Sequence, residues 1–192
     1  MRIQPRLTMG RGLALLWSAS PATAEQVTVE VVRGLIKDEP YTIIYPASLK
    51  AGSGSGDDLL VLDYPGAPLQ CAATMKVGVP AMSAQEALAA FDAEAEAAPW
   101  RERFPNFTVA DPHLGSLANV PALRYLGDTG QSPGGNRYLL YRAEAVDEGR
   151  LYGMECMVGY SIAQDARDII EFLIINFSTR SDGKCCQQPG GQ

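Results

Sequence analysis

The sequence predicts an α+β protein, because strands and helices are marked in separate segments of the chain. Residues 69–77 alternate between apolar and polar side chains, with Cys71 on the apolar side, which is strand periodicity. Ser83 and Glu86 form the S-x-x-E pattern of a capping box, which begins many helices. Residues 166–177 repeat apolar side chains at helical spacing. The length of 192 residues and the ordinary composition suit one folded domain.

The first 24 residues have the three parts of a secretory signal peptide. They contain three arginines and no acid, then a short apolar run at residues 12–17, then small residues ending at Ala24. The apolar run is shorter than the roughly 20 residues that span a bilayer. We therefore expect cleavage after Ala24, no membrane span, and a mature protein in the periplasm or outside the cell.

The chain is acidic, with 16 Lys and Arg against 22 Asp and Glu. The only charged side chains in residues 1–24 are arginines, so removal of this segment makes the mature domain more acidic still. Proteins that bind nucleic acid present clustered Lys and Arg to the phosphates, so a nucleic-acid partner is not expected. An acidic surface favours basic or cationic partners, although a merely solvated face is the simpler interpretation.

Turn residues divide the remaining chain into further elements. One helix is expected from Ser83 to Pro99, with Asp92, Glu94 and Glu96 on its wet surface. Strands are expected at residues 26–32, 41–45, 59–62 and 120–125, and a hairpin at residues 138–146 and 151–160. The glycine-rich stretch at 51–58 is expected to be a loop, and it lacks the Lys that a phosphate-binding loop needs. The last residues, 181–192, are expected to form a disordered tail.

The order of these segments resembles the PsbP-like family of small exported α/β proteins. The resemblance covers about residues 26 to 180 and consists of element order and short strings. These strings are YTIIYP at 41–46, SAQE at 83–86, PALRY at 121–125, GRLY at 149–152 and INFS at 175–178. The resemblance implies a domain over residues 25–180 built as a single antiparallel sheet flanked by helices, an α/β/α sandwich. It also implies a role in binding or assembly rather than catalysis, and no family functional residue can be placed on this chain.

In the oxidising compartment that the signal peptide implies, the cysteines can form disulfides. Cys71 shares the apolar side of its strand, and Cys156 shares strand parity with Tyr152 and Val158. If the two strands are neighbours, or face one another across the core, a Cys71–Cys156 disulfide is geometrically feasible, and we expect it to form. The alternative is two buried, inert thiols.

The other two cysteines, Cys185 and Cys186, are adjacent and near the end of the chain. A bond between neighbours strains the peptide that joins them, so an intermolecular disulfide or free thiols are favoured. The C-x-x-C spacing of redox and zinc sites is absent from the sequence, and no metal or cofactor is expected.

Catalysis has little support in the sequence. His113 is the single histidine, so a Ser-His-Asp or Cys-His arrangement would have to use it, and a histidine on a loop is the simpler interpretation. Tyrosines and Trp100 could line a pocket between sheet and helix, although aromatic residues in strands usually pack in the core.

These observations predict a non-enzymatic exported accessory or binding protein that takes a protein partner or an apolar small molecule. Two alternatives remain: a hydrolase-type enzyme that uses His113, and a structural or self-associating envelope module joined through Cys185 or Cys186.

Overall fold

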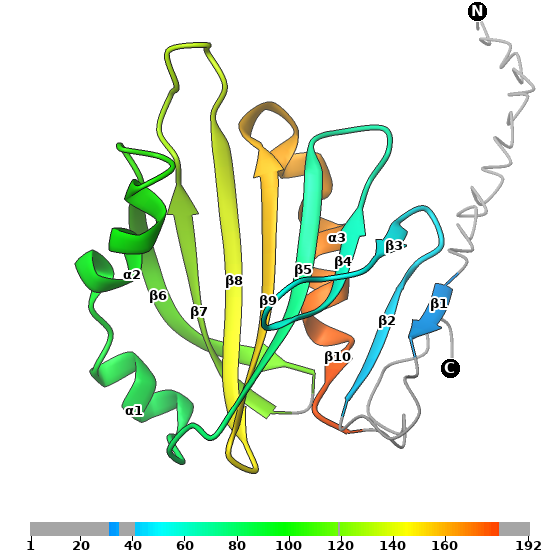
Figure 1. The fold of residues 1–192 in the computed structure, drawn as a ribbon, viewed down its shortest axis with the longest axis vertical. Helices are drawn as coiled ribbons and strands as arrows, with labels where there is room; N and C mark the ends of the chain where they lie inside the picture. Colours follow the sequence, from blue (N-terminus) through cyan, green and yellow to red (C-terminus); the bar gives the residue numbers. More distant parts are fainter. Residues whose placement is uncertain (1–30, 35–40, 119, 181–192) are drawn as a thin grey trace, which may run out of the picture.

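The computed structural model describes residues 31–34, 41–118 and 120–180 (Figure 1). The expected signal peptide at 1–24, most of the expected strand at 26–32, and the tail at 181–192 with Cys185 and Cys186 lie outside the described residues.

A seven-stranded antiparallel sheet forms the body of the molecule, in the order β3-β4-β5-β9-β8-β7-β6. Its strands are β3 (Lys50–Gly52), β4 (Asp58–Asp63), β5 (Leu69–Val77), β6 (Thr108–Leu117), β7 (Val120–Asp128), β8 (Tyr138–Asp147) and β9 (Arg150–Gly159). The structure confirms the predicted strand at 69–77 and the predicted hairpin, which is β8 and β9.

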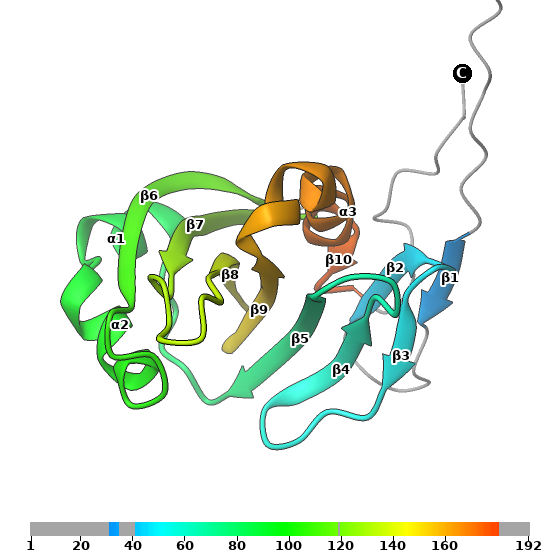
Figure 2. The same ribbon diagram turned by 90° about the horizontal axis from the view of Figure 1, so that it is seen from above.

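Helices lie on both faces of this sheet (Figure 2). On one face, α1 (Ala84–Ala89) and α2 (Ala93–Arg101) lie beside β6 and β7. On the other face, the short 3₁₀ turn η1 (Tyr160–Ile162) leads into α3 (Ala163–Ile175), which confirms the predicted closing helix. Within the described ranges, no helix is long and apolar enough to cross a membrane.

The prediction of a single sheet flanked by helices is wrong, because a second, three-stranded sheet packs beside α3. It consists of β1 (Val31–Gly34), β2 (Thr42–Pro46) and β10 (Phe177–Ser178), in the order β1-β2-β10. Every residue of β2 is buried, so this strand is covered on both faces. The backbone N–H of Ile44 also donates to Asn176 at the end of α3. A strand fixed in this way joins the core as a separate layer and does not extend the main sheet.

The main core lies between α3, the small sheet and the facing side of the large sheet. Ile170 and Leu173 of α3 are fully buried there, and the rings of Tyr41 and Tyr152 each meet Phe177 edge-on. Burial of such side chains contributes about 1.5–3 kcal/mol each.

The predicted disulfide is present in this core. Cys71 on β5 and Cys156 on β9 are direct partners in the strand register, and their Cα atoms lie 4.0 Å apart. Both cysteines are fully buried. The bond joins two central strands across a sequence separation of 85 residues.

The single helix expected from Ser83 to Pro99 is two helices. The Ser83–Glu86 capping box is confirmed at the start of α1, but the chain leaves the helix at Ala90. Asp92 then caps α2 by accepting hydrogen bonds from two backbone N–H groups of that helix. Pro99 lies inside α2 and does not end it. A tertiary contact stabilises the last turn of α2, since Trp100 stacks on Phe107.

The long edge strand β6 was not expected, because Pro112 interrupts its periodicity. The structure accommodates the proline in an irregularity of the β6–β7 register between Ala110 and His113, where Asp111 has a φ of 57°. Bulges and prolines are common on edge strands, where they discourage pairing with another chain.

Candidate functional site

A cleft of about 410 Å³ lies between helices α1 and α2 and the sheet face formed by β7, β8 and β9. Most of its wall is apolar: Val79, Pro80, Met82, Ala84, Ala87, Ala90, Phe91, Ala95, Leu123, Ala145, Val146 and Leu151. Ser83, Asp92, Glu96 and Glu144 complete the lining. Pockets of about 300–1,000 Å³ with apolar walls and a few polar groups are typical of small-molecule sites.

Local sequence features build the two sides of this cleft. The capping box starts α1 directly after the connection from β5, and that connection is tied to the β8–β9 turn by hydrogen bonds from Gly78 and Val79 to the Gly149 carbonyl, at 3.0 and 3.2 Å. The helices contribute small side chains, including Ala84, Ala87 and Ala95. Since alanine carries only a methyl group, the space between helix and sheet stays unfilled. No residue of α1 is buried, so this helix covers the cleft without being part of a core.

Two acids of the cleft lining, Glu96 and Glu144, form its polar end and both contact the phenol of Tyr125, a buried residue of β7 that does not itself line the cleft. The Tyr125 hydroxyl lies 2.8 Å from Glu96 on α2 and 3.1 Å from Glu144 on β8. The Tyr125 ring also packs against Phe91, with 5.2 Å between the ring centroids. This contact explains why the helix is interrupted here, since Phe91 leaves the helical path to cover the tyrosine.

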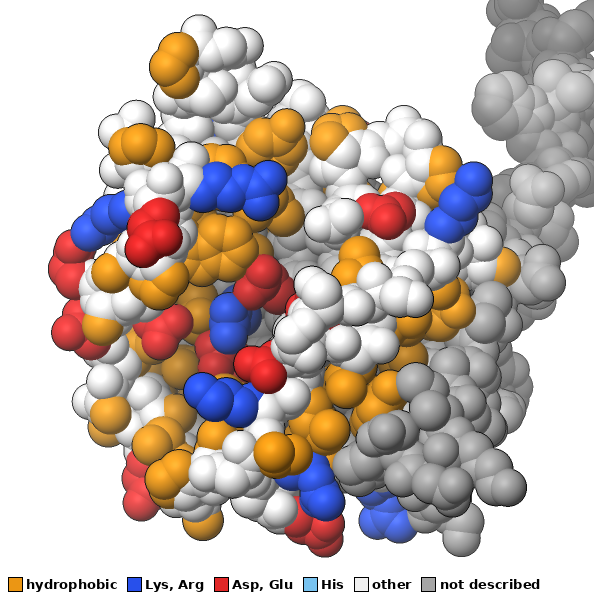
Figure 3. All heavy atoms as spheres, viewed as in Figure 1, with side chains coloured by type: hydrophobic (Ala, Val, Ile, Leu, Met, Phe, Trp, Pro, Cys, Tyr) orange, Lys and Arg blue, Asp and Glu red, His pale blue; other side chains and the backbone are white. Residues whose placement is uncertain are grey.

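Arg142 connects this end of the cleft to the open part of the sheet face. Its Nε lies 2.8 Å from Glu144, and its Nη1 lies 2.7 Å from Glu155. Tyr125, Arg142 and Glu155 are direct neighbours across β7, β8 and β9, so their side chains share one face. Figure 3 shows acidic and basic side chains following one another down the middle of this face.

Burial decides the electrostatics of the network. It raises the pKa of Glu155 above its ordinary value, and the opposing effect of Arg142 does not outweigh it. Burial also raises the pKa of Tyr125, which keeps the phenol protonated. Burial acts to lower the pKa of Arg142, but the carboxylates around it dominate and raise the pKa, so the guanidinium stays charged.

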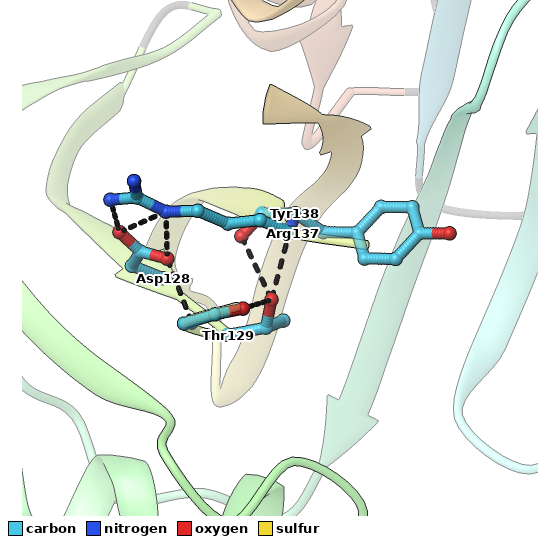
Figure 4. A network of polar contacts seen from close by, with 5 residues as sticks. Asp128, Thr129, Arg137 and Tyr138 are labelled. Carbon is cyan, nitrogen blue, oxygen red and sulfur yellow. Dashed lines mark hydrogen bonds and ion pairs between the residues drawn. The ribbon is translucent and has the colours of Figure 1, made fainter. Parts of the chain in front are cut away.

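A second polar network lies away from this cleft, at the base of the loop between β7 and β8 (Figure 4). Arg137 contacts the Asp128 carboxylate through Nε and Nη2, and its guanidinium lies 3.9 Å from the ring centre of Tyr160. Thr129 accepts a hydrogen bond from the Tyr138 N–H at 2.9 Å. These contacts close the loop, so we interpret the network as structural. A hollow of about 720 Å³ beside the loop is formed mainly by chain connections rather than by the sheet.

The structure separates the residues that the sequence singled out. Cys71 and Cys156 lie in the core below α3, away from the cleft. His113 lies on β6, directly opposite Arg124, and does not line the cleft. Arg124 contacts Glu171 of α3, which lies on the other face of the sheet. The His113 side chain is exposed, and its Nδ1 lies 2.8 Å from the Asp111 carbonyl oxygen. Within the described residues, no group of His, Cys, Asp and Glu is suited to hold a metal ion.

Sequence reasoning missed most of the residues that form the polar end. Tyr125 was considered only as one of several aromatic residues, and Glu96 was assigned to a wet helix surface. The signal for Arg142 and Glu144 was present, because they alternate with Ala143 and Ala145 in a predicted strand and therefore share its opposite face.

Sequence comparison finds no matching family model and no matching curated protein. Comparison of structures does find a match, to cyanobacterial PsbP (CyanoP) from Synechocystis sp. PCC 6803. The TM-score is 0.52 at 7% sequence identity, over 80% of this chain and 95% of that one. The chain has a PsbP-like fold. The resemblance noted from the sequence is thereby confirmed, and at this identity it concerns the fold alone.

Two other solved structures are similar at lower scores. One is LpqN, described as involved in cell envelope biogenesis of Mycobacterium tuberculosis, with a TM-score of 0.45 at 12% identity over 78% of this chain and 90% of that one. The other is a protein of Bacteroides thetaiotaomicron VPI-5482, with a TM-score of 0.47 at 9% identity over 80% of this chain and 47% of that one. The PsbP-like fold supplies the scaffold, and the cleft must be interpreted from its own residues.

Proposed function

We propose that this chain is an exported, non-enzymatic binding protein whose ligand is an apolar small molecule held between helices α1 and α2 and the sheet. The observation that carries the proposal is the cleft itself. It is bounded by the seven-stranded sheet on one side and by a helix without buried residues on the other. Such a helix can move outward at little loss of packing, which gives an apolar ligand a way in.

Apolar burial would supply the binding energy. Leu123, Val146 and Leu151 present aliphatic side chains from three neighbouring strands, and Met82 lines the cleft while 43% of its surface is exposed. A ligand that covers these side chains removes apolar area from water, at about 25 cal/mol for each Å².

Export is the second part of the proposal. The signal-peptide pattern at residues 1–24 and the disulfide between Cys71 and Cys156 both support it, because structural disulfides form and persist mainly in oxidising compartments. An accessory role in the envelope agrees with these features.

Binding is favoured over catalysis by the positions of the reactive groups. His113, on which the hydrolase alternative depends, does not line the cleft. Glu96 and Glu144 lie near each other, as paired acids do in glycoside hydrolases. Sugar rings, however, need many hydrogen-bonding groups along the site, and the walls here are apolar.

The test is the binding of the neutral apolar dye N-phenyl-1-naphthylamine, followed by its fluorescence. Ala87→Phe would fill the cleft from α1, and we expect it to weaken dye binding at least about tenfold. Ala89→Phe is the matched control, because Ala89 is an exposed residue of the same helix and does not line the cleft. Equal dye binding by both variants, or no binding by the wild type, would overturn the proposal.

A further inference from the structure

We propose that the cleft selects apolar molecules that carry a cationic amine, with the amine placed between Glu96 and Glu144. This inference rests on the proposed function, and it specifies the chemical class of the ligand. It follows from the charge that the polar end of the cleft presents to an otherwise apolar space.

The first step is a count of protons at the phenol. The hydroxyl of Tyr125 has one proton, but two carboxylates lie within hydrogen-bond distance, Glu96 at 2.8 Å and Glu144 at 3.1 Å. The hydroxyl can donate to one of them at a time. The other carboxylate then faces the hydroxyl oxygen with no proton between them.

The second step is a count of charges. Arg142 is the one guanidinium in the described network. It forms ion pairs with Glu144 through Nε and with Glu155 through Nη1, and of these two only the Glu155 contact has hydrogen-bond geometry. Glu96 adds a third carboxylate. When all three carboxylates are ionised, the network therefore has an excess of negative charge beside a space lined by apolar side chains.

An amine would supply further donors and a compensating positive charge. A primary ammonium group has three N–H donors and one positive charge, so it can donate to Glu96 and to Glu144 while the phenol keeps its own bond. Its apolar part would lie along Leu123 and Val146, which line the cleft next to Glu144. An anionic ligand of the same shape would be repelled by the carboxylates, and a neutral one would leave the charge excess in place.

The competing explanation is that the carboxylates only fasten α2 to the sheet, through the Glu96–Tyr125 contact. That role predicts no preference for a charged ligand. Ligand charge at constant shape therefore separates the two explanations.

The experiment compares octylamine, 1-octanol and octanoate at pH 7 as competitors of the bound dye. All three have the same chain length, and they carry a positive charge, no charge and a negative charge. We expect octylamine to displace the dye at a concentration at least about tenfold lower than 1-octanol, and octanoate to be the weakest competitor.

Two variants assign the preference to the acids. Glu96→Gln and Glu144→Gln should each remove most of the preference for octylamine over 1-octanol. Glu102→Gln is the matched control, since it removes the same charge from an exposed position at the end of α2 that does not line the cleft. Glu96 is on the surface helix, so its variant should fold even if the Glu144 variant does not.

The outcomes distinguish this inference from the proposed function. If 1-octanol competes as well as octylamine, or if the preference survives in Glu96→Gln, the amine proposal is wrong and the apolar cleft stands. If a soluble hexalysine peptide displaces the dye while octylamine does not, the site recognises a basic protein partner and the amine proposal is also wrong. If the wild type does not bind the dye, the proposed function itself fails.

Discussion

Arg142 and Glu155 lie directly opposite each other on β8 and β9, and the guanidinium Nη1 is 2.7 Å from the carboxylate. Only about a quarter of each side chain is exposed, at 24% and 25%. The pair is not balanced, because Arg142 also contacts Glu144 while Glu155 carries a raised pKa caused first by burial. Removal of the arginine and removal of the acid should therefore have very different effects.

Arg142→Gln should lower the free energy of unfolding by about 2–3 kcal/mol at pH 7, below the 3–5 kcal/mol typical of fully buried pairs. It leaves Glu144 and Glu155 partly buried without their counter-charge. Arg142→Lys should recover part of the loss, because it keeps the charge. Urea unfolding measures each difference. An Arg142→Gln variant as stable as the wild type would show that Glu144 and Glu155 do not need Arg142 as their counter-charge.

Glu155→Gln should change the stability at pH 7 by less than about 1 kcal/mol, in either direction. A carboxyl group whose pKa is raised by folding opposes folding once it ionises. That penalty is absent below its unfolded pKa and fully present above its folded pKa. The variant should therefore gain stability relative to the wild type as the pH rises from about 4 toward neutral. Urea midpoints measured over this range test the trend. A variant whose stability relative to the wild type falls with rising pH would contradict it.

The Arg142–Glu155 pair could have been predicted from the sequence. The hairpin was recognised there, and its short turn after Asp147 places Asp147 opposite Arg150. Moving away from the turn by the same number of residues on each strand brings Arg142 opposite Glu155. Because side chains alternate along a strand, Arg142 and Glu144 must then share the face opposite Ala143.

The rest of the site depends on contacts between segments that are distant in the sequence. Nothing local indicates that β7 lies beside β8 and so places Tyr125 next to Arg142. The sequence also did not indicate that the helix is interrupted at Ala90, because the alanine-rich stretch has helical periodicity throughout. Its cause is tertiary, since Phe91 packs on Tyr125. The same applies to the second sheet. A strand was expected at 41–45, but no local pattern indicated that it would pair with β1 and β10.

Loss of the disulfide should be strongly destabilising. The double variant Cys71→Ala, Cys156→Ala should lose about 4–5 kcal/mol of unfolding free energy in the chain-entropy model, because the bond closes a loop over a separation of 85 residues. Urea unfolding under oxidising conditions would measure the loss. Reductant should lower the midpoint of the wild type and leave that of the variant unchanged. Equal midpoints for the two proteins under oxidising conditions would contradict the presence of the disulfide.

The Asp128–Arg137 contact should give the protein a pH-dependent stability. The hydrogen bond from Arg137 holds the pKa of Asp128 below its ordinary value. The ionised carboxylate therefore stabilises the fold above the unfolded pKa, near 4, and this contribution is lost as the pH falls through the folded pKa. Asp128→Asn should be less stable than the wild type by about 1–2 kcal/mol at pH 7, with a smaller difference below pH 4. Arg137→Gln should show the same trend, and a difference that does not vary with pH would contradict this explanation.

Export predicts a defined N-terminus. If the full chain is produced with its own leader in a Gram-negative host, the intact mass of the periplasmic protein should correspond to a chain that begins at Glu25. Ala24→Asp should block processing, because a small residue is needed at this position. An unprocessed wild-type chain in the cytosol would contradict the localisation proposed here.

The capping box of α1 should control how often the cleft opens. Ser83 accepts a hydrogen bond from the Glu86 N–H, and the Glu86 carboxylate accepts one from the Ser83 N–H at 2.8 Å. Loss of an N-cap costs about 1 kcal/mol, which corresponds to a roughly fivefold increase in local opening. Because no residue of α1 is buried, this loss should stay in the helix and leave global stability nearly unchanged.

Hydrogen exchange followed by mass spectrometry measures this opening in the Ser83→Ala variant. Amides of α1 should exchange about five times faster than in the wild type, while those of the β8–β9 hairpin keep their rates. Ser83→Asp, which retains an N-cap acceptor, should restore the slow exchange. Faster exchange throughout the sheet would show instead that α1 belongs to the cooperative core, and the cleft could then open only when the whole domain unfolds.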